Sequence, residues 1–232
     1  MQKIDPLISK LFELKAYIGH RSSRVHPKAE KMFVFKNENK ISLIDLTKTV
    51  SHLKKAKEYA YDLGKQGKVL LFVGTKKNIA EIIKNLCLEN NLMYITTKWP
   101  PGLLTNFETI KKNIDLLRQM KKEKEEGNWD KFPKHERIKL QKKLNKLLRI
   151  YGGIENLENL PDAIYLVDLR KERNAIRESK KLQIPTIGIT DTNVDPTLVD
   201  YPIPANDDYP QVVEFITQEI IKSYLEGQKA KK

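Results

Sequence analysis

From residue 69 onwards, the chain alternates short apolar runs with longer amphipathic segments. Residues 69–73 read Val-Leu-Leu-Phe-Val, a continuous apolar run that is typical of a strand covered on both faces. The same pattern predicts further strands at 93–96, 163–167, 186–189 and 201–203, and helices at 75–88, 171–182 and 208–225. Strands separated by helices favour a doubly wound parallel sheet, so the predicted fold class is α/β.

The first part of the chain has a different pattern. Asp5 followed by Pro6 predicts a helix start, and the helix is expected to continue to about Tyr17. Residues 20–28 are polar and basic without periodicity, which predicts an irregular loop. A β-hairpin is expected over 32–35 and 41–44, followed by a helix from Thr47 that ends before Gly67.

A lysine-rich insertion lies between Asn106 and Gly152. Apolar positions recur at a four-then-three spacing on each of its limbs, at Ile110, Ile114 and Leu117 and again at Leu140, Leu144, Leu147 and Tyr151. This spacing gives each helix one apolar seam, as an antiparallel, coiled-coil-like helical hairpin requires. Gly127-Asn128 supplies the turn, and the tip is packed by Trp129, Phe132 and Pro133. The remaining faces are basic, which fits either a solvated surface or an arm that docks on a polyanion or a partner.

Composition narrows the classes of partner. The 232 residues are enough to bury a sizeable core, and one α/β domain with an inserted arm accounts for that length. The formal net charge of +13 favours RNA, DNA or an anionic surface over a small neutral substrate. The single cysteine, Cys87, excludes an internal disulfide and is expected to be buried. No apolar run approaches the roughly 20 residues of a membrane span and the start of the chain does not resemble a signal peptide, so a soluble, intracellular protein is expected.

The turn after the first strand of the sheet is a candidate anion site. Gly74-Thr75-Lys76-Lys77 lacks the glycines of a P-loop or of a dinucleotide fingerprint. What remains is a threonine-capped helix start followed by two lysines, which suits a phosphate group. The competing interpretation is a plain cap with solvated lysines.

An enzymatic alternative depends on acidic residues. Asp168 and Asp191 each follow a predicted strand, where open α/β sheets place ligands. With Lys76 they would hold magnesium and a phosphoryl group, as in a phosphoryl-transfer enzyme or a receiver-like domain. Asp195, Asp207 and Asp208 are further candidates, although aspartates in such positions commonly form turns and helix caps. The four histidines lack the spacing of a zinc site, and no cofactor or metal is expected.

A series of short strings occurs in order over nearly the whole chain. They are Tyr17-Ile18-Gly19-His20 and residues 24–28, 44–49, 69–77, 99–106, 152–154, 160–163, 191–196 and 200–208. Together these strings resemble the family of bacterial small-subunit ribosomal protein two. One departure is Lys98-Trp99-Pro100-Pro101-Gly102, where family members usually read Arg-Trp-Leu-Gly-Gly. The lysine replaces a bidentate arginine contact by a point charge.

The resemblance implies a flavodoxin-like sheet that carries a helical hairpin. It also implies a structural, non-enzymatic protein that binds small-subunit rRNA by backbone and shape contacts, between the head and the body near the mRNA exit. Neighbouring small-subunit ribosomal proteins are expected as partners, whereas a membrane and a small-molecule substrate are not. The expected location is the small ribosomal subunit, in the cytoplasm or alternatively in an organelle.

These interpretations define the predicted contacts. Contacts with rRNA phosphates are assigned to Arg21, Arg24, Lys28, Lys31, Lys76, Lys77 and Lys98. The turn before the hairpin is shaped by Trp99, Thr105 and Asn106, with packing favoured over base stacking for Trp99. Hairpin docking is assigned to Lys111, Lys112, Lys139, Lys142, Lys143, Lys146 and Arg149. A free regulatory α/β protein that binds acidic partners is a third class.

The sequence is expected to divide into four segments. Residues 1–104 comprise the N-terminal helix, the basic loop, the β-hairpin and the first part of the α/β domain. Residues 105–152 form the inserted hairpin, 153–226 the remainder of the α/β domain, and 227–232 a basic tail.

Overall fold

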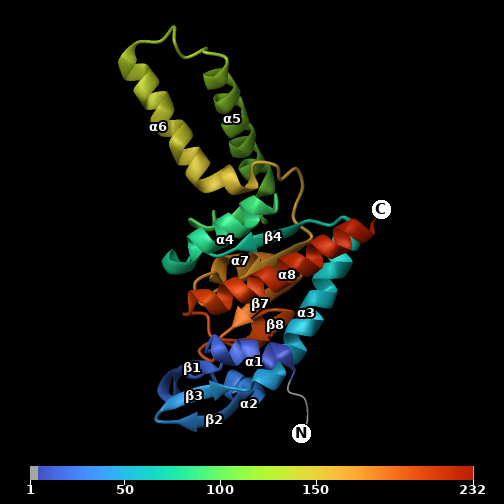
Figure 1. The fold of residues 1–232 in the computed structure, drawn as a ribbon. Helices are drawn as coiled ribbons and strands as arrows, with labels where there is room; N and C mark the ends of the chain where they lie inside the picture. Colours follow the sequence, from blue (N-terminus) through green and yellow to red (C-terminus); the bar gives the residue numbers. More distant parts are fainter. Residues whose placement is uncertain (1–4, 232) are drawn as a thin grey trace.

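A five-stranded parallel sheet forms the centre of the molecule (Figure 1). The computed structural model describes residues 5–231. The strand order is β5-β4-β6-β7-β8, and the strands are β4 (Leu70–Val73), β5 (Tyr94–Ile95), β6 (Ala163–Leu166), β7 (Thr186–Thr190) and β8 (Tyr201–Pro204). Every residue of β4, β6 and β7 is buried, which confirms the prediction of strands covered on both faces.

Alternate side chains of the sheet enter two different cores. Leu70 and Phe72 pack with helices α3 (Leu46–Gln66), α4 (Lys77–Glu89) and α8 (Pro210–Ala230). Leu71 and Val73 face the opposite side, where α7 (Arg173–Lys181) and the base of the insertion cover the sheet. The doubly wound α/β class is therefore confirmed. Cys87 is fully buried in the first core, as expected.

Helices α3 and α8 lie against each other along one face of the sheet (Figure 1). Their contact depends on two glycines, because a Cβ on Gly227 would lie 2.0 Å from the carbonyl oxygen of Tyr61 and one on Gly64 2.1 Å from that of Tyr224. Helix α8 continues through this contact to Ala230, so residues 227–230 of the predicted basic tail are helical. Within residues 5–231, no helix is both long enough and apolar enough to cross a bilayer.

The N-terminal part forms a small subdomain beside the sheet. Its antiparallel sheet has the order β1-β3-β2, with β1 (Ile18–Arg21), β2 (Val34–Glu38) and β3 (Ile41–Ile44). Helix α1 (Pro6–Glu13) ends earlier than predicted because Lys15 has a left-handed φ of 61°. The irregular loop predicted over 20–28 is also wrong. It contains the end of β1, the 3₁₀ helix η1 (Ser22–Arg24) and the start of α2 (Pro27–Phe33), which His26 caps through its side chain.

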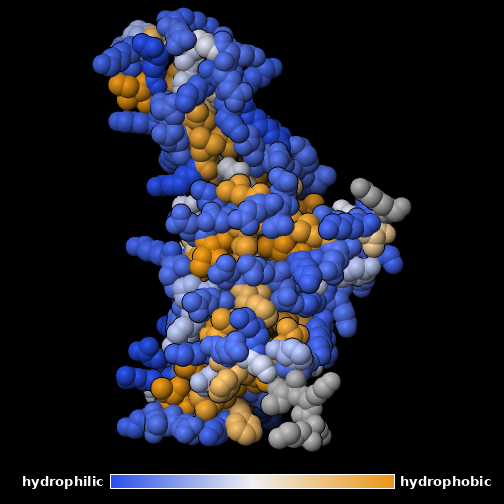
Figure 2. Space-filling view, viewed as in Figure 1, coloured by the Kyte–Doolittle hydropathy of each residue, from blue (hydrophilic) through white to orange (hydrophobic). Residues whose placement is uncertain are grey.

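The insertion forms two antiparallel helices that project from the sheet, α5 (Phe107–Glu125) and α6 (Lys134–Tyr151) (Figure 1). Figure 2 shows an apolar seam between them with hydrophilic residues on both sides. The predicted seam residues Ile110, Ile114, Leu117, Leu144, Leu147 and Tyr151 are buried, and Leu140 is half-buried. Gly127 turns the chain with a φ of 71°, and Trp129 is buried at the tip. A coiled-coil-like geometry stays a prediction.

Candidate nucleic-acid interface

Lys76 lies at the carboxyl edge of the sheet, where it is surrounded by carboxylates. Its Nζ is 2.6 Å from Asp208 Oδ1, 2.9 Å from Asp207 Oδ1 and 3.8 Å from Asp168 Oδ2. Although burial lowers the pKa of Lys76, its hydrogen bond to Asp208 and the charge of Asp207 raise that pKa overall. The ammonium group is thus neutralised inside the chain, which removes the basis for assigning Lys76 to an rRNA phosphate.

The threonine-capped anion site predicted at the start of α4 is wrong. The N-cap position is Lys76, and no side chain caps the helix there. Thr75 instead donates from its backbone N–H, at 3.0 Å, and from its hydroxyl to the buried carboxylate of Glu172. Burial raises the pKa of Glu172. Thr75 is therefore engaged by Glu172 and not by the start of the helix.

Asp191 is fully buried and joins the N-terminal subdomain to the sheet. One of its oxygens lies 3.0 Å from His20 Nδ1, and the other accepts a hydrogen bond from the backbone N–H of Asp207. The hydrogen bond to Asp191 raises the pKa of His20. Burial, reinforced by the charges of Asp191 and Asp168, raises the pKa of Asp207 to about 7.

These groups contact one another and do not surround an open site. Among residues 5–231, no group of three or more histidine, cysteine, aspartate or glutamate side chains is arranged to hold a metal ion. The magnesium site considered at Asp168, Asp191 and Lys76 consequently has no geometric support. The aspartates near residue 195 have the predicted turn chemistry, since Asp195 accepts from the N–H of Thr197 at 2.9 Å.

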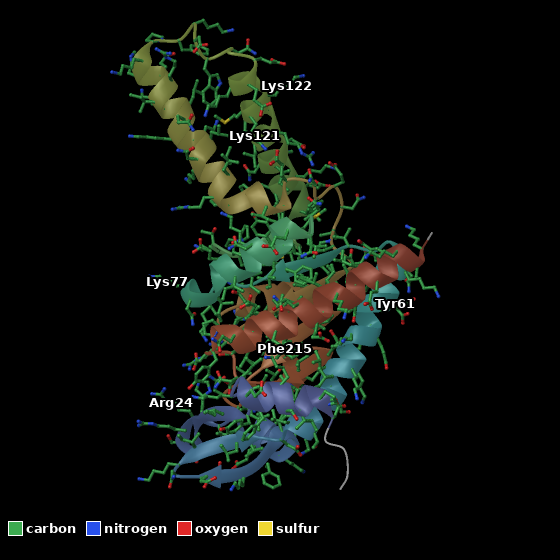
Figure 3. The ribbon with its side chains drawn as sticks, in the orientation of Figure 1. Arg24, Tyr61, Lys77, Lys121, Lys122 and Phe215 are labelled. Carbon is green, nitrogen blue, oxygen red and sulfur yellow. The ribbon has the colours of Figure 1, made fainter. Side chains whose placement is uncertain are left out.

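Several predicted RNA-contact residues do lie on the surface. Arg21, Arg24, Lys31, Lys77 and Lys98 are exposed, and no salt bridge involves them within the described part of the chain. Figure 3 places Arg24 and Lys77 along the same side of the molecule. Lys28 is also exposed, but its Nζ lies 2.7 Å from Asp195 Oδ2. We use the name basic edge for the exposed cations without a salt bridge in the described part of the chain, namely Arg21, Arg24, Lys31, Lys77 and Lys98, and leave Lys28 out of it.

The turn before α5 is held by Glu178, a residue that the sequence analysis did not identify. One carboxylate oxygen of Glu178 accepts from Trp99 Nε1 at 3.0 Å and from the N–H of Gly102 at 2.9 Å. The other oxygen accepts from the N–H of Leu104 at 3.0 Å and from the N–H and hydroxyl of Thr105 at 3.2 Å. Trp99 is 4% exposed, so it packs in the turn and does not present its ring for stacking. Thr105 and Asn106 are exposed beside it.

The two helices of the insertion differ in how their charges are paired. On α5, Lys111 Nζ is 3.4 Å from Glu158, Lys121 Nζ is 2.8 Å from Glu155, and Lys122 Nζ is 3.8 Å from Glu126 (Lys121 and Lys122 are labelled in Figure 3). Lys112 is exposed. On α6 every predicted docking residue is exposed and has no salt bridge within residues 5–231, namely Lys139, Lys142, Lys143, Lys146 and Arg149. Unpaired positive charge is therefore concentrated on α6.

A second group that the sequence analysis missed is a set of three arginines. Arg170, Arg173 and Arg177 line a cavity of about 360 Å³ at the carboxyl edge of the sheet. All three are exposed. The spacing of Arg173 and Arg177 four positions apart was a usable signal, because it puts both side chains on one face of a helix.

Known proteins match this sequence along almost the whole chain. The model of the family described as "Ribosomal protein S2" matches residues 11–227. The chain is 40% identical over 221 residues to "Small ribosomal subunit protein uS2" of Dictyoglomus turgidum, an alignment that covers 95% of this chain and 89% of that protein. The protein of the same name from Dictyoglomus thermophilum matches with the same identity and coverage.

Proposed function

Because the chain belongs to the ribosomal protein S2 family, whose members are structural proteins of the small ribosomal subunit and not enzymes, we propose that it binds small-subunit rRNA through backbone and shape contacts. The proposed location is between the head and the body of the subunit, near the mRNA exit, in the cytoplasm. The proposed partners are rRNA and neighbouring small-subunit proteins. The enzymatic alternative is not retained, since the family is not enzymatic and Lys76, Asp168 and Asp191 are engaged with other side chains.

The observation that carries this proposal is the separation of paired from unpaired cations. Lys76, Lys28 and Lys121 are neutralised by nearby carboxylates. The basic edge and the outer side of α6 have no such partners within residues 5–231 and are exposed. Phosphate binding releases counterions only where cations are available to replace them. We therefore assign the phosphate contacts to these two surfaces and leave Lys28 and Lys76 out.

The turn of residues 98–106 has a different role in the proposal. Lys98 is the phosphate contact, and the buried Trp99 supports the backbone beneath it. Thr105 and Asn106 set the start of α5 and thereby the direction in which the hairpin leaves the sheet. The exposed lysines of α5 and α6 then dock on rRNA or on a neighbouring protein.

The test is sedimentation of the full chain with small ribosomal subunits at increasing salt concentration. Co-migration that weakens steeply with salt is expected, because each phosphate contact contributes about 0.7–0.9 to the steepness of the fall of log K with log salt. A variant with Arg24→Gln and Lys77→Gln should reduce the slope, whereas Lys65→Gln with Lys68→Gln, at the opposite edge of the sheet, should not. Free migration of the wild-type chain at physiological salt would refute the proposal.

A further inference from the structure

The cavity at the carboxyl edge of the sheet combines arginines with an apolar floor. Arg170 belongs to the loop after β6, and Arg173 and Arg177 belong to α7. Beneath them lie Leu169, Ile176 and Val194, which are 1%, 4% and 7% exposed. We call this cavity the arginine pocket. Its volume of about 360 Å³ lies at the lower end of the range of roughly 300–1,000 Å³ that is usual for sites that hold small organic groups.

The guanidinium groups of the pocket are free to bind an anion. Arg170, Arg173 and Arg177 form no salt bridge and no side-chain hydrogen bond within the described residues. Asp195, a carboxylate in the wall, is already engaged by Lys28 at 2.7 Å. Although burial raises the pKa of Asp195, the hydrogen bonds from Lys28 and Thr197 lower it to about 2. The lining of the pocket therefore has more positive than negative side chains, and no carboxylate within the described residues forms a salt bridge with the three arginines.

The wall also contains polar groups suited to a sugar or a base. His26 Nδ1 accepts from the N–H of Lys28 at 3.3 Å, so a neutral imidazole carries its proton on Nε2 as a donor. Asn193 donates its amide to His20, and its Oδ1 is buried without a partner in the described part of the chain. Both residues come from segments that adjoin the basic edge.

This combination selects among anionic ligands. Inorganic phosphate would use the arginines but leave the apolar floor uncovered. A peptide made of acidic residues alone would also place carboxylates on the arginines, but it has no flat group to cover the floor. A nucleotide uses both parts, because its phosphate accepts bidentate hydrogen bonds from arginine while its base lies on apolar surface or on a guanidinium plane.

We propose that the arginine pocket holds one unpaired nucleotide of small-subunit rRNA, with its phosphate on Arg173 and Arg177 and its base against the floor formed by Leu169, Ile176 and Val194. That this nucleotide belongs to rRNA rests on the proposed function, because a free nucleotide would offer the same phosphate and base. The pocket accepts a base that is not paired, so it distinguishes single-stranded from duplex RNA.

The experiment uses the full chain labelled at isoleucine methyl groups. Four probes are titrated: a single-stranded RNA hexamer, a blunt RNA duplex, adenosine 5′-monophosphate and a hexaglutamate peptide. The variant Arg173→Gln with Arg177→Gln is compared with Lys65→Gln and Lys68→Gln, which changes the net charge equally at the opposite edge of the sheet. Circular dichroism checks the fold, and Arg170→Gln serves as a second variant if the double variant does not fold.

The proposal predicts that the hexamer shifts the Ile176 methyl signal and that the duplex does not. The arginine variant should bind the hexamer about 10-fold more weakly or worse, with a salt slope reduced by about 0.7 for the one phosphate of single-stranded RNA that both arginines hold, whereas the lysine control should stay within about 2-fold. Equal losses in the two variants, or equal binding of duplex and hexamer, would overturn the pocket in favour of general charge attraction.

The remaining probes identify the ligand class. An Ile176 shift caused by hexaglutamate, as large as that caused by RNA, would overturn the proposal in favour of a protein partner. Saturation by the monophosphate without binding of the hexamer would overturn it in favour of a free nucleotide. If the hexamer occupies the pocket but the chain does not co-migrate with small subunits, the proposed function fails and the RNA-binding pocket stands.

Discussion

At the scale of single residues, the turn before the hairpin depends on one carboxylate. Glu178 accepts hydrogen bonds from the side chains of Trp99 and Thr105 and from three backbone N–H groups. Although partial burial raises the pKa of Glu178, these donors lower it overall. The sequence predicted a packed Trp99 correctly. It could not predict the acceptor, because Glu178 lies 79 positions from Trp99 on a different element.

The substitution Glu178→Gln tests this role. The amide keeps one acceptor oxygen but turns its NH₂ group toward backbone donors, so we expect a loss of about 1–3 kcal/mol in the free energy of unfolding. Amide exchange at Gly102, Leu104 and Thr105 should become faster than in the wild type. Glu81→Gln, an exposed carboxylate on α4, is the matched control and should leave both measurements unchanged.

Asp207 gives a prediction about pH. Its pKa is raised to about 7 from the ordinary value of 3.8, so between these values the folded state retains a proton that the unfolded state has lost. Stability is therefore expected to fall as the pH rises from 5 to 7, by up to about 3 kcal/mol at about 1.4 kcal/mol per unit. The raised pKa of His20 acts in the same direction, because the stabilising protonated form is lost at higher pH.

Urea denaturation at pH 5 and pH 8 checks this expectation. Asp207→Asn should reduce the difference in the free energy of unfolding between the two pH values to the part that is due to His20. Glu81→Gln, the exposed carboxylate on α4, is the control and should leave the difference in stability between the two pH values unchanged. A wild-type protein equally stable at both pH values would contradict the assignment.

At the scale of elements, periodic segments were predicted well and aperiodic ones were not. The helices α3, α4, α5 and α6 and the strand β4 occur where the apolar spacing placed them. Residues 20–28 were mistaken for a loop because β1 is defined by pairing with β3 and not by its own sequence. Tertiary pairing decides such short segments, and a single sequence does not display it.

The crossing of α3 and α8 can be tested with one added methyl group. Gly227→Ala would bring a Cβ to 2.0 Å from the backbone of Tyr61, so the two helices must separate. We expect the free energy of unfolding to fall by about 1–3 kcal/mol, measured by urea denaturation. Gly152→Ala is the control, because its nearest neighbour would be 3.9 Å away, and it should change stability little.

The difference in charge pairing between α5 and α6 gives a further prediction. Lys142→Gln with Lys146→Gln removes two unpaired cations from α6, and Lys121→Gln with Lys122→Gln removes two paired cations from α5. The salt slope for binding to the small subunit should fall by up to about 1.8 in the α6 variant and clearly less in the α5 variant. Equal slopes would show that the ion pairs of α5 do not withhold its lysines from RNA.

At the scale of the whole molecule, the sequence predicted the architecture and the sign of the charge but not which charges are available. The parallel sheet and the projecting hairpin follow from local periodicity. Lys76 and Lys77 are adjacent in the sequence, yet only Lys77 is free, because Asp207 and Asp208 reach Lys76 from more than 130 positions away. Likewise, the arginine pocket is assembled from separate loops and a helix, so the sequence displayed only part of it.

The contact between Gly64 and Gly227 also bears on how the chain matures during synthesis. Helix α3 is translated early, but much of the surface that buries it is provided by α8, whose residues are translated far later. Until then, the apolar side of α3 must stay uncovered or be shielded by other molecules, and the closing step joins distant segments, which is slow in folding. The nascent chain would thus close this part of its core only after α8 has been synthesised and has left the exit tunnel.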